Sequence, residues 1–392
     1  MSARRPSIAV VAHRGPSSRT RAIGRGALLA AAVAAALLAG CGSSRPKPAP
    51  LVALTPKIAG RQVWSTRLDA VRFPLVLALA GGRVYAAASS GSVAAFDVDS
   101  GREIWRAQAG GEVAAGVGSD GRYASVVTRA NEVVTFDDGK EVWRARVRSR
   151  VATPPLVAGE RVFVLAVDRS VEAFDAVDGR RLWRLQRPGD PLTLAQPGVL
   201  APFHNTLLVG QGPRLAGVDP LNGRLQWELP IASPRGTNEV ERLADLVGPA
   251  LRQGERVCAR AFQAAVGCAD LARGTVLWSR NVGGTDPVGG DAERIYGADA
   301  VDRVSAWKAE TGDVLWTNEQ LLNRGLSGVL AAGTTVVAGD REGYVHFLAA
   351  ASGEMQLRLP TDGSAVVGTP VLAGTTILVA TAGGGLYAFR PQ

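Results

Sequence analysis

One phrase returns at regular intervals along the chain, and it constrains the fold more than any other feature. Two of its copies read "AFDVDSGREIW" at 95–105 and "AFDAVDGRRLW" at 173–183. Seven tryptophans mark it at spacings of 41, 38, 40, 44, 51 and 38 residues: Trp64, Trp105, Trp143, Trp183, Trp227, Trp278 and Trp316. A further step of 41 reaches Leu357. A repeat near 40 residues is typical of a four-stranded propeller blade, so eight anchors predict an all-β, eight-bladed β-propeller.

Four strands can be placed within a single repeat. Between 75 and 105 they read "LVLALA", "GRVYAAAS", "SVAAFDV" and "REIWRAQ", and short Gly-bearing turns connect them as antiparallel hairpins. Asp97 can accept hydrogen bonds from the amides that follow it, and Gly101 can adopt the positive φ that closes the turn. The Asp of the phrase is therefore predicted to build turns and not to catalyse a reaction. The Trp is predicted to pack between neighbouring blades.

The two ends of the repeat region predict how the ring closes. Trp64 stands in a fourth-strand segment, "RQVWSTR", with no first three strands before it, whereas the C-terminal segment supplies three strands with no fourth. The N-terminal strand is expected to complete the last blade, which removes two exposed sheet edges. Residues 61–392 are thus predicted to form one propeller domain.

The N-terminus has the pattern of a lipoprotein signal. Residues 1–40 hold six arginines and no acidic residue, followed by a short apolar run and then Cys41. We expect cleavage before Cys41, lipidation of its thiol, and stable anchoring by its acyl chains. Residues 41–60 carry four prolines beyond the cysteine and are expected to form an extended tether. Removing the six arginines lowers the net charge from +9 to +3, which gives little reason to expect nucleic-acid binding.

Two cysteines remain in the body of the chain, in "RVCARAFQAAVGCAD" at 256–270. A two-residue turn in this hairpin would set Ala259 opposite Cys268, whereas an odd-length or bulged turn would bring Cys258 and Cys268 face to face. A disulfide and two free thiols both stay open at this point. The ligand spacing of a structural zinc site is absent from the sequence, and no metal or cofactor is expected.

The repeat resembles the propeller repeat of quinoproteins, which two families share. The quinoprotein dehydrogenases hold pyrroloquinoline quinone and Ca²⁺ on the ring axis, many with adjacent cysteines, and this sequence lacks that cysteine pair and the long insertions. The BamB family of outer-membrane assembly factor lipoproteins is similar over nearly the whole mature chain. "PLTLAQPG" at 191–198, "GTNEVERLADL" at 236–246 and the segment 321–353 resemble that family's own stretches.

The BamB resemblance implies a protein that is not an enzyme. It implies a scaffold of the β-barrel assembly machinery, lipid-anchored on the periplasmic face of the outer membrane. The implied partners are the POTRA domains of BamA and the other lipoproteins of the machine, with nascent outer-membrane proteins as a further expectation. The alternatives are a periplasmic propeller that senses a peptide or glycan, and a dehydrogenase dependent on pyrroloquinoline quinone.

The binding face can be predicted from the spacing of the anchors. The two longest steps, 44 and 51, place extra residues at roughly 184–195 and 228–246, between the fourth strand of one blade and the first of the next. Such connections lie at one end of a ring, where long loops commonly bind partners. The predicted contacts are Leu192, Leu194, Glu239, Arg242 and Asp245. The family resemblance supports the leucines and Asp245, but Ala195 and Val247 replace an Arg and an Asp, so a more apolar interface is expected. Burial of the leucines in the next blade is the competing interpretation.

Overall fold

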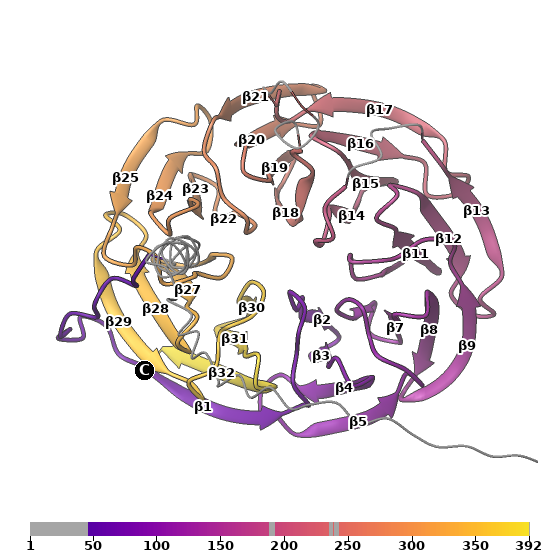
Figure 1. Ribbon diagram of the computed structural model, residues 1–392, viewed down its shortest axis with the longest axis horizontal. Helices are drawn as coiled ribbons and strands as arrows, with labels where there is room; N and C mark the ends of the chain where they lie inside the picture. The colour runs from indigo at the N-terminus through magenta and orange to yellow at the C-terminus, as the bar shows by residue number, and fades with distance from the viewer. Residues whose placement is uncertain (1–45, 188–192, 235–237, 239–242, 392) are drawn as a thin grey trace, which may run out of the picture. The chain divides into compact units, whose positions relative to one another are not determined.

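The eight predicted blades are present as eight separate antiparallel sheets. The structure is a computed structural model, and it describes residues 46–187, 193–234, 238 and 243–391. Contacts divide the chain into Met1–Pro46 and Lys47–Gln392, and the sheets all belong to the second unit. Within it the sheets stand side by side around a ring, as Figure 1 shows. The described residues contain no helix that could cross a membrane.

Each of the first seven blades contains four consecutive strands. The first four blades are β2 (Ala78–Ala80), β3 (Arg83–Ala87), β4 (Ser92–Asp97), β5 (Glu103–Gln108); β6 (Gly118–Ser119), β7 (Tyr123–Val127), β8 (Glu132–Asp137), β9 (Lys140–Arg146); β10 (Leu156–Ala158), β11 (Arg161–Leu165), β12 (Val171–Asp175), β13 (Arg181–Leu185); and β14 (Leu200–Phe203), β15 (Thr206–Gln211), β16 (Arg214–Val218), β17 (Leu225–Pro230). The next three are β18 (Leu246–Gln253), β19 (Arg256–Ala261), β20 (Ala265–Asp270), β21 (Thr275–Arg280); β22 (Gly289–Gly290), β23 (Arg294–Ala298), β24 (Val304–Lys308), β25 (Val314–Asn318); and β26 (Leu330–Ala332), β27 (Thr335–Gly339), β28 (Tyr344–Ala349), β29 (Met355–Pro360).

The eighth blade joins the two ends of the domain, as the sequence predicts. It contains β30 (Val371–Ala373), β31 (Thr376–Ala380), β32 (Gly385–Pro391) and β1 (Gly60–Arg67), in the order β1-β32-β31-β30. Strand β1 runs antiparallel to β32, with Trp64 opposite Ala388. The first strands are shorter than predicted: β2 begins at Ala78, not at Leu75.

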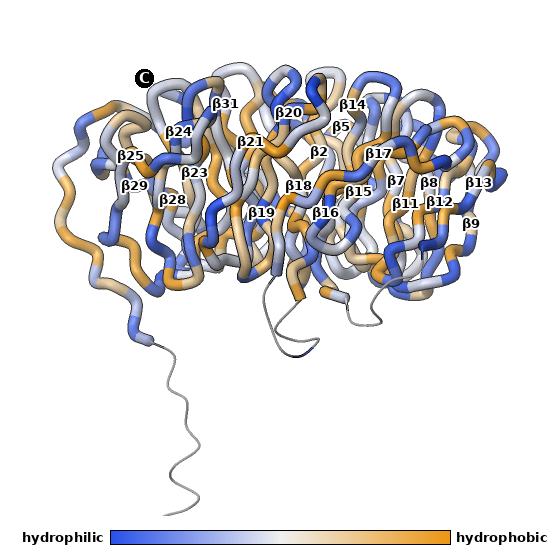
Figure 2. Tube along the Cα trace, turned by 90° about the horizontal axis from the view of Figure 1, so that it is seen from above, coloured by the Kyte–Doolittle hydropathy of each residue, from blue (hydrophilic) through white to orange (hydrophobic). Residues whose placement is uncertain are grey.

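The position of a strand in its blade determines how its residues are buried. First strands such as β2 and β14 line the centre of the ring, and fourth strands such as β5 and β17 form its outer wall (Figure 1). Second and third strands are buried on both faces because each blade packs between two others, and β7 is buried at every position. This double burial explains the continuous Val- and Ala-rich runs. Hydrophilic residues gather near the turns at the two faces of the ring, with apolar residues along the strands between them (Figure 2).

The repeated phrase builds a turn and a bulge. Asp97 accepts hydrogen bonds from the backbone and the hydroxyl of Ser100, and Gly101 has φ +71°. The pairing of the third and fourth strands shifts register next to the residue that faces the Trp. In the first blade Ala95 faces Trp105, and the shift lies between Ala95 and Phe96. The extra residue of such a bulge twists the outer strand locally. The Asp of the phrase is therefore occupied by the turn.

The cysteine hairpin has the odd-length turn. Ala261 pairs with Ala265, so three residues form the turn, and Cys258 lies directly opposite Cys268. The two cysteines form a disulfide across β19 and β20, with their Cα atoms 4.0 Å apart. A three-residue turn of this kind resolves the two alternatives that the sequence leaves open.

Candidate partner-binding site

The described parts of the two long connections lie next to each other. The first runs from the end of β13 at Leu185 to the start of β14 at Leu200, and the second from Pro230 to Leu246. The backbone N–H of Leu194 in the first connection donates to Oδ2 of Asp245 in the second, at 2.9 Å. Pro197 accepts a hydrogen bond from Gly248, also at 2.9 Å, just beyond the same region. The structure therefore places Leu194 and Asp245 side by side.

Asp245 uses both carboxylate oxygens within the protein. Its Oδ1 accepts a hydrogen bond from Nη2 of Arg169 at 2.9 Å, and each of the two side chains is 18% exposed. Arg169 stands in the turn between β11 and β12, and its carbonyl accepts a hydrogen bond from Gln211 of β15. Asp245 thus links its own blade to the third blade and to the connection that leads into the fourth. A partly buried, charge-assisted pair of this kind fixes geometry well.

Leu194 precedes the first strand of its blade. Strand β14 starts six residues later at Leu200, and the side chain of Leu194 is half-buried. Leu194 is therefore neither part of the strand nor fully sequestered. Leu192, Glu239 and Arg242 lie outside the described residues.

The two departures from the family pattern have different surroundings. Val247 is buried within β18, where it pairs with Arg260 of β19. Ala195 is exposed, one residue after Leu194. The apolar side chain at 247 therefore contributes to the core of the fifth blade.

The space between the connections is too small for a cofactor. A cavity of about 40 Å³ lies there, with Thr153, Arg169, Leu194, Gln196 and Asp245 in its wall. This volume suffices for a few water molecules, whereas sites for small organic ligands measure about 300 Å³ or more.

The ring axis holds a larger cavity with little reactive chemistry. It measures about 430 Å³ and is lined by the first strands of blades one to five and by residues just before them, including Leu77, Pro155, Leu200 and Pro249. Among the described residues of this wall only Arg252 is charged, and its guanidinium donates to the carbonyl of Pro202. In the described ranges no three His, Cys, Asp or Glu side chains are grouped to hold a metal ion.

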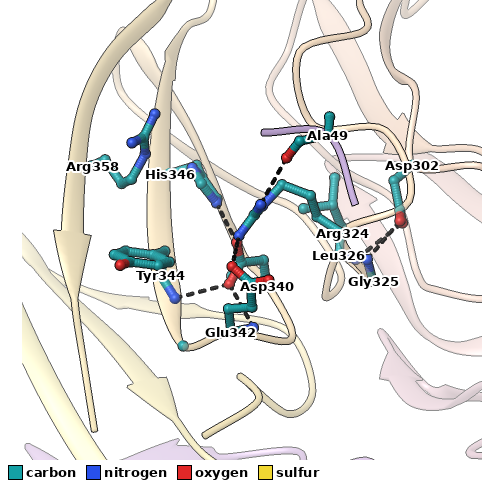
Figure 3. A network of polar contacts seen from close by, with 12 residues as sticks. Ala49, Asp302, Arg324, Gly325, Leu326, Asp340, Glu342, Tyr344, His346 and Arg358 are labelled. Carbon is teal, nitrogen blue, oxygen red and sulfur yellow. Dashed lines mark hydrogen bonds and ion pairs between the residues drawn. The ribbon is translucent and has the colours of Figure 1, made fainter. Parts of the chain in front are cut away.

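A buried network in the seventh blade was missed by the sequence reasoning (Figure 3). Asp340 accepts hydrogen bonds from Nε of Arg324 at 2.8 Å and Nε2 of His346 at 2.9 Å, all three side chains being buried. Burial acts to raise the pKa of Asp340, but hydrogen bonds from His346 and Tyr344 outweigh it, so this pKa lies below its usual value. Burial lowers the pKa of His346. Sequence spacing gives no signal for this network because its members come from separate turns and strands.

The same network holds part of the segment expected to act as a tether. Nη1 of Arg324 donates to the carbonyl of Ala49 at 2.9 Å, and the N–H of Ala49 donates to Leu322 at 2.8 Å. Further along, the N–H of Lys57 donates to Gln356 of β29. Residues 49–57 therefore lie against the seventh blade.

Comparison with known proteins places this chain among relatives of one kind. The family model described as "Outer membrane protein assembly factor BamB" matches residues 47–112 and 89–318. The BamB of Bordetella pertussis is 36% identical, with 95% of this chain and 99% of that protein aligned. The BamB of Burkholderia pseudomallei is 35% identical over 93% of this chain and 97% of that protein.

A solved structure supports the fold. The crystal structure of BamB from Moraxella catarrhalis has a TM-score of 0.77 at 24% identity, and covers 84% of this chain and 99% of that one. The two relatives above are more than one-third identical over at least 97% of their length, and the solved structure is similar to the ring of eight blades described here. The chain belongs to the BamB family of outer membrane protein assembly factors.

Proposed function

We propose that this protein is a non-enzymatic scaffold of the machinery that assembles β-barrel proteins in the outer membrane. It is anchored by lipid on Cys41 at the periplasmic face, and it binds the POTRA domains of BamA through the face that carries the two long connections. The observation that carries the proposal is the hydrogen bond between Leu194 and Asp245, which brings two loops remote in sequence into one surface. Family membership supplies the kind of partner.

The described residues of this surface have distinct roles in the proposal. Leu194 presents an apolar side chain that is half-buried in the free protein and becomes covered in the complex. Asp245 acts as a positioning residue, because Arg169 and the Leu194 amide already occupy its oxygens. Leu192, Glu239 and Arg242 complete the contact set as predicted from the sequence.

The proposed interface combines leucines with Glu239 and Arg242, and it is more apolar than the family's usual one. Ala195 supplies no charge, Val247 is buried, and the Arg169–Asp245 pair is internal. Coulomb contributions from exposed charges weaken with salt, whereas apolar burial does not. Binding to BamA should therefore be less sensitive to ionic strength than the family's usual interface, and the remaining dependence should come from Glu239 and Arg242. The other lipoproteins of the machine and nascent outer-membrane proteins are further proposed partners.

Recovery of partners from solubilised outer membrane tests this function. The full lipidated protein should capture BamA, identified by mass spectrometry, and the double variant Leu192→Ala/Leu194→Ala should not. Leu221 is the matched control, since it is 64% exposed in the turn after β16, at the opposite face of the ring. Leu221→Ala should capture BamA normally. Absence of BamA from the wild-type eluate would overturn the proposal.

Anchoring has its own test. Cys41→Ser should abolish incorporation of labelled palmitate and release the protein from the membrane fraction. Continued labelling of that variant would show that the lipid is attached elsewhere.

A further inference from the structure

The seam between the seventh and eighth blades differs from the other seams in one residue pair. Seven anchor tryptophans each face a small residue on the third strand of their own blade: Ala95, Thr135, Ala173, Gly217, Cys268, Ala306 and Ala388. The eighth anchor, Leu357, faces Phe347 instead. In this blade the aromatic residue stands on the third strand, as Phe347, and the fourth strand carries Leu357 in place of a Trp.

An apolar cavity lies at this seam. Its volume is about 290 Å³, and its wall includes Phe347, Leu357, Leu359, Leu372, Ile377 and Phe389. The exposed residues Leu372, Gly374 and Thr375 form part of the same wall, so the cavity opens to solvent. A volume near 300 Å³ is at the lower end of the range for small-ligand sites.

The other seams show what such a space accommodates. The indole of Trp105 lies 6.3 Å from the ring of Phe136 on the next blade, and that of Trp143 lies 6.1 Å from Phe174. Phe389 holds the corresponding place on the eighth blade, one residue after the partner of the closing Trp64. It lines the cavity, the ring of Phe347 from the seventh blade lies edge-on to it at 6.4 Å, and Tyr387 of its own strand stacks with it.

The eighth blade also has a residue at the position whose carbonyl accepts the indole N–H in other seams. Five anchor indoles donate their N–H to a backbone carbonyl of the next blade, as Trp143 does to Ala176 and Trp64 to Val98. In each case the acceptor lies three residues after the third-strand residue that faces that next blade's own anchor. The residue at that place in the eighth blade is Pro391, which lines the cavity. The seam therefore keeps two next-blade features of an indole site, the ring of Phe389 and the position of Pro391, while its own blade supplies a leucine.

We propose that this cavity binds an aromatic side chain, indole best, from an extended segment of another polypeptide. The ring would lie against Phe389 and between Leu357 and Leu372, where it removes apolar surface from water. The identification of the source as an unfolded polypeptide rests on the proposed function, because a barrel-assembly scaffold meets such chains. The preference for an aromatic ring rests on the seam geometry alone.

The test uses the mature protein and two short peptides. Acetyl-Gly-(5-fluorotryptophan)-Gly-amide, followed by its ¹⁹F NMR line width, should bind the wild-type protein, and unlabelled acetyl-Gly-Trp-Gly-amide should displace it. Acetyl-Gly-Ala-Gly-amide should not displace it. Displacement by octanoate as effective as that by the Trp peptide would indicate a general apolar site and overturn the aromatic assignment, as would no binding at all.

Two variants connect the binding to this seam. Phe347→Ala/Leu357→Trp rebuilds the pair found in the other blades and fills the slot, so the peptide should bind roughly tenfold more weakly or not at all, with no loss in Tm. Leu372→Ser changes the mouth without touching the filled core and should also weaken binding by roughly tenfold. Leu315→Ser is the control, since Leu315 is exposed on β25, outside the cavity. Unchanged binding in both seam variants would overturn the proposal.

The result can be separated from the proposed function. Both seam variants should still capture BamA, because their substitutions lie on blades seven and eight, away from Leu194 and Asp245. Capture of BamA without peptide binding would reject the seam site alone. Peptide binding that depends on the seam, without capture of BamA, would reject the proposed function alone.

Discussion

The indole of Trp143 lies directly on Gly179 of the next blade: a Cβ atom at 179 would sit 2.5 Å from the ring. The same contact joins Trp64 to Gly101, Trp183 to Gly223, Trp278 to Gly312 and Trp316 to Gly353. In these five seams the Gly of one phrase therefore packs against the Trp of the preceding blade. The contact between the Trp of one blade and the Gly of the next explains both the fixed spacing of the phrase and the packing of neighbouring blades.

Gly179→Ala should destabilise the ring more than a glycine replacement in an open turn. Gly179 has φ +72° and contacts the indole, whereas Gly159 has φ +57° and no atom within 4 Å of the place a Cβ would take. Left-handed backbone costs an L-residue roughly 1–2 kcal/mol, and overpacking adds about 1–3 kcal/mol. Urea unfolding should show the larger loss for Gly179→Ala. Equal losses for Gly159→Ala and Gly179→Ala would contradict the packing role.

Trp143→Ala should be more damaging than Trp183→Ala. Trp143 is 7% exposed and donates to Ala176 at 2.8 Å, whereas Trp183 is only partly buried, although it also donates to a carbonyl. A fully buried Trp replaced by Ala costs about 3–5 kcal/mol, and partial burial reduces that loss. The midpoint of denaturation for each variant measures the difference. A larger loss at 183 would mean that exposure does not rank the anchors.

The stability of the seventh blade should depend on pH through His346. Burial lowers the pKa of this His below its ordinary value of 6.5, so the unfolded chain binds a proton more readily than the folded one. This contribution to stability is full above pH about 6.5 and is lost as pH falls through the lower folded pKa. Replacing His346 with Gln should remove that part of the decline in unfolding free energy between neutral and acidic pH.

His204→Gln provides the matched comparison for that pH series. Its ring is 69% exposed and pairs with Glu255 at the surface. The slope of stability against pH should match wild type in His204→Gln and be shallower in His346→Gln. The reverse order would place the titrating group outside the network of Figure 3.

Asp245→Ala should weaken binding to BamA indirectly. Loss of the carboxylate leaves Arg169 without its partner and releases the Leu194 amide. If Asp245 only positions the loop, Arg169→Ala should weaken binding similarly, although Arg169 is not among the predicted contacts. Surface affinity measurements on both variants distinguish the roles, since a direct contact would make Asp245→Ala much the worse of the two.

The sequence carries the blade count because each blade repeats a Trp, an Asp turn and a Gly at fixed spacing. The sequence also predicts how the ring closes, because Trp64 stands in a single strand before the first complete blade. It could not determine that Trp227 departs from the rule: its indole lies over Gly217 of its own blade, and Gly274 of the next phrase has no atom nearby. The sequence also gives no indication of the ion pair between Arg169 and Asp245, because 76 residues separate them. Spacing predicts which loops share a face, whereas individual pairings depend on side-chain geometry.

Binding of the purified periplasmic region of BamA to the mature protein tests the central claim most directly. Burying a fully exposed leucine contributes about 1.5–3 kcal/mol, and Leu194 is already half-buried, so Leu192→Ala/Leu194→Ala should raise Kd by roughly tenfold or more. The Kd of Leu221→Ala should equal that of wild type, and all three proteins should have nearly the same Tm. An unchanged Kd for the double variant, with the fold intact, would contradict the account and place the BamA site elsewhere on the ring.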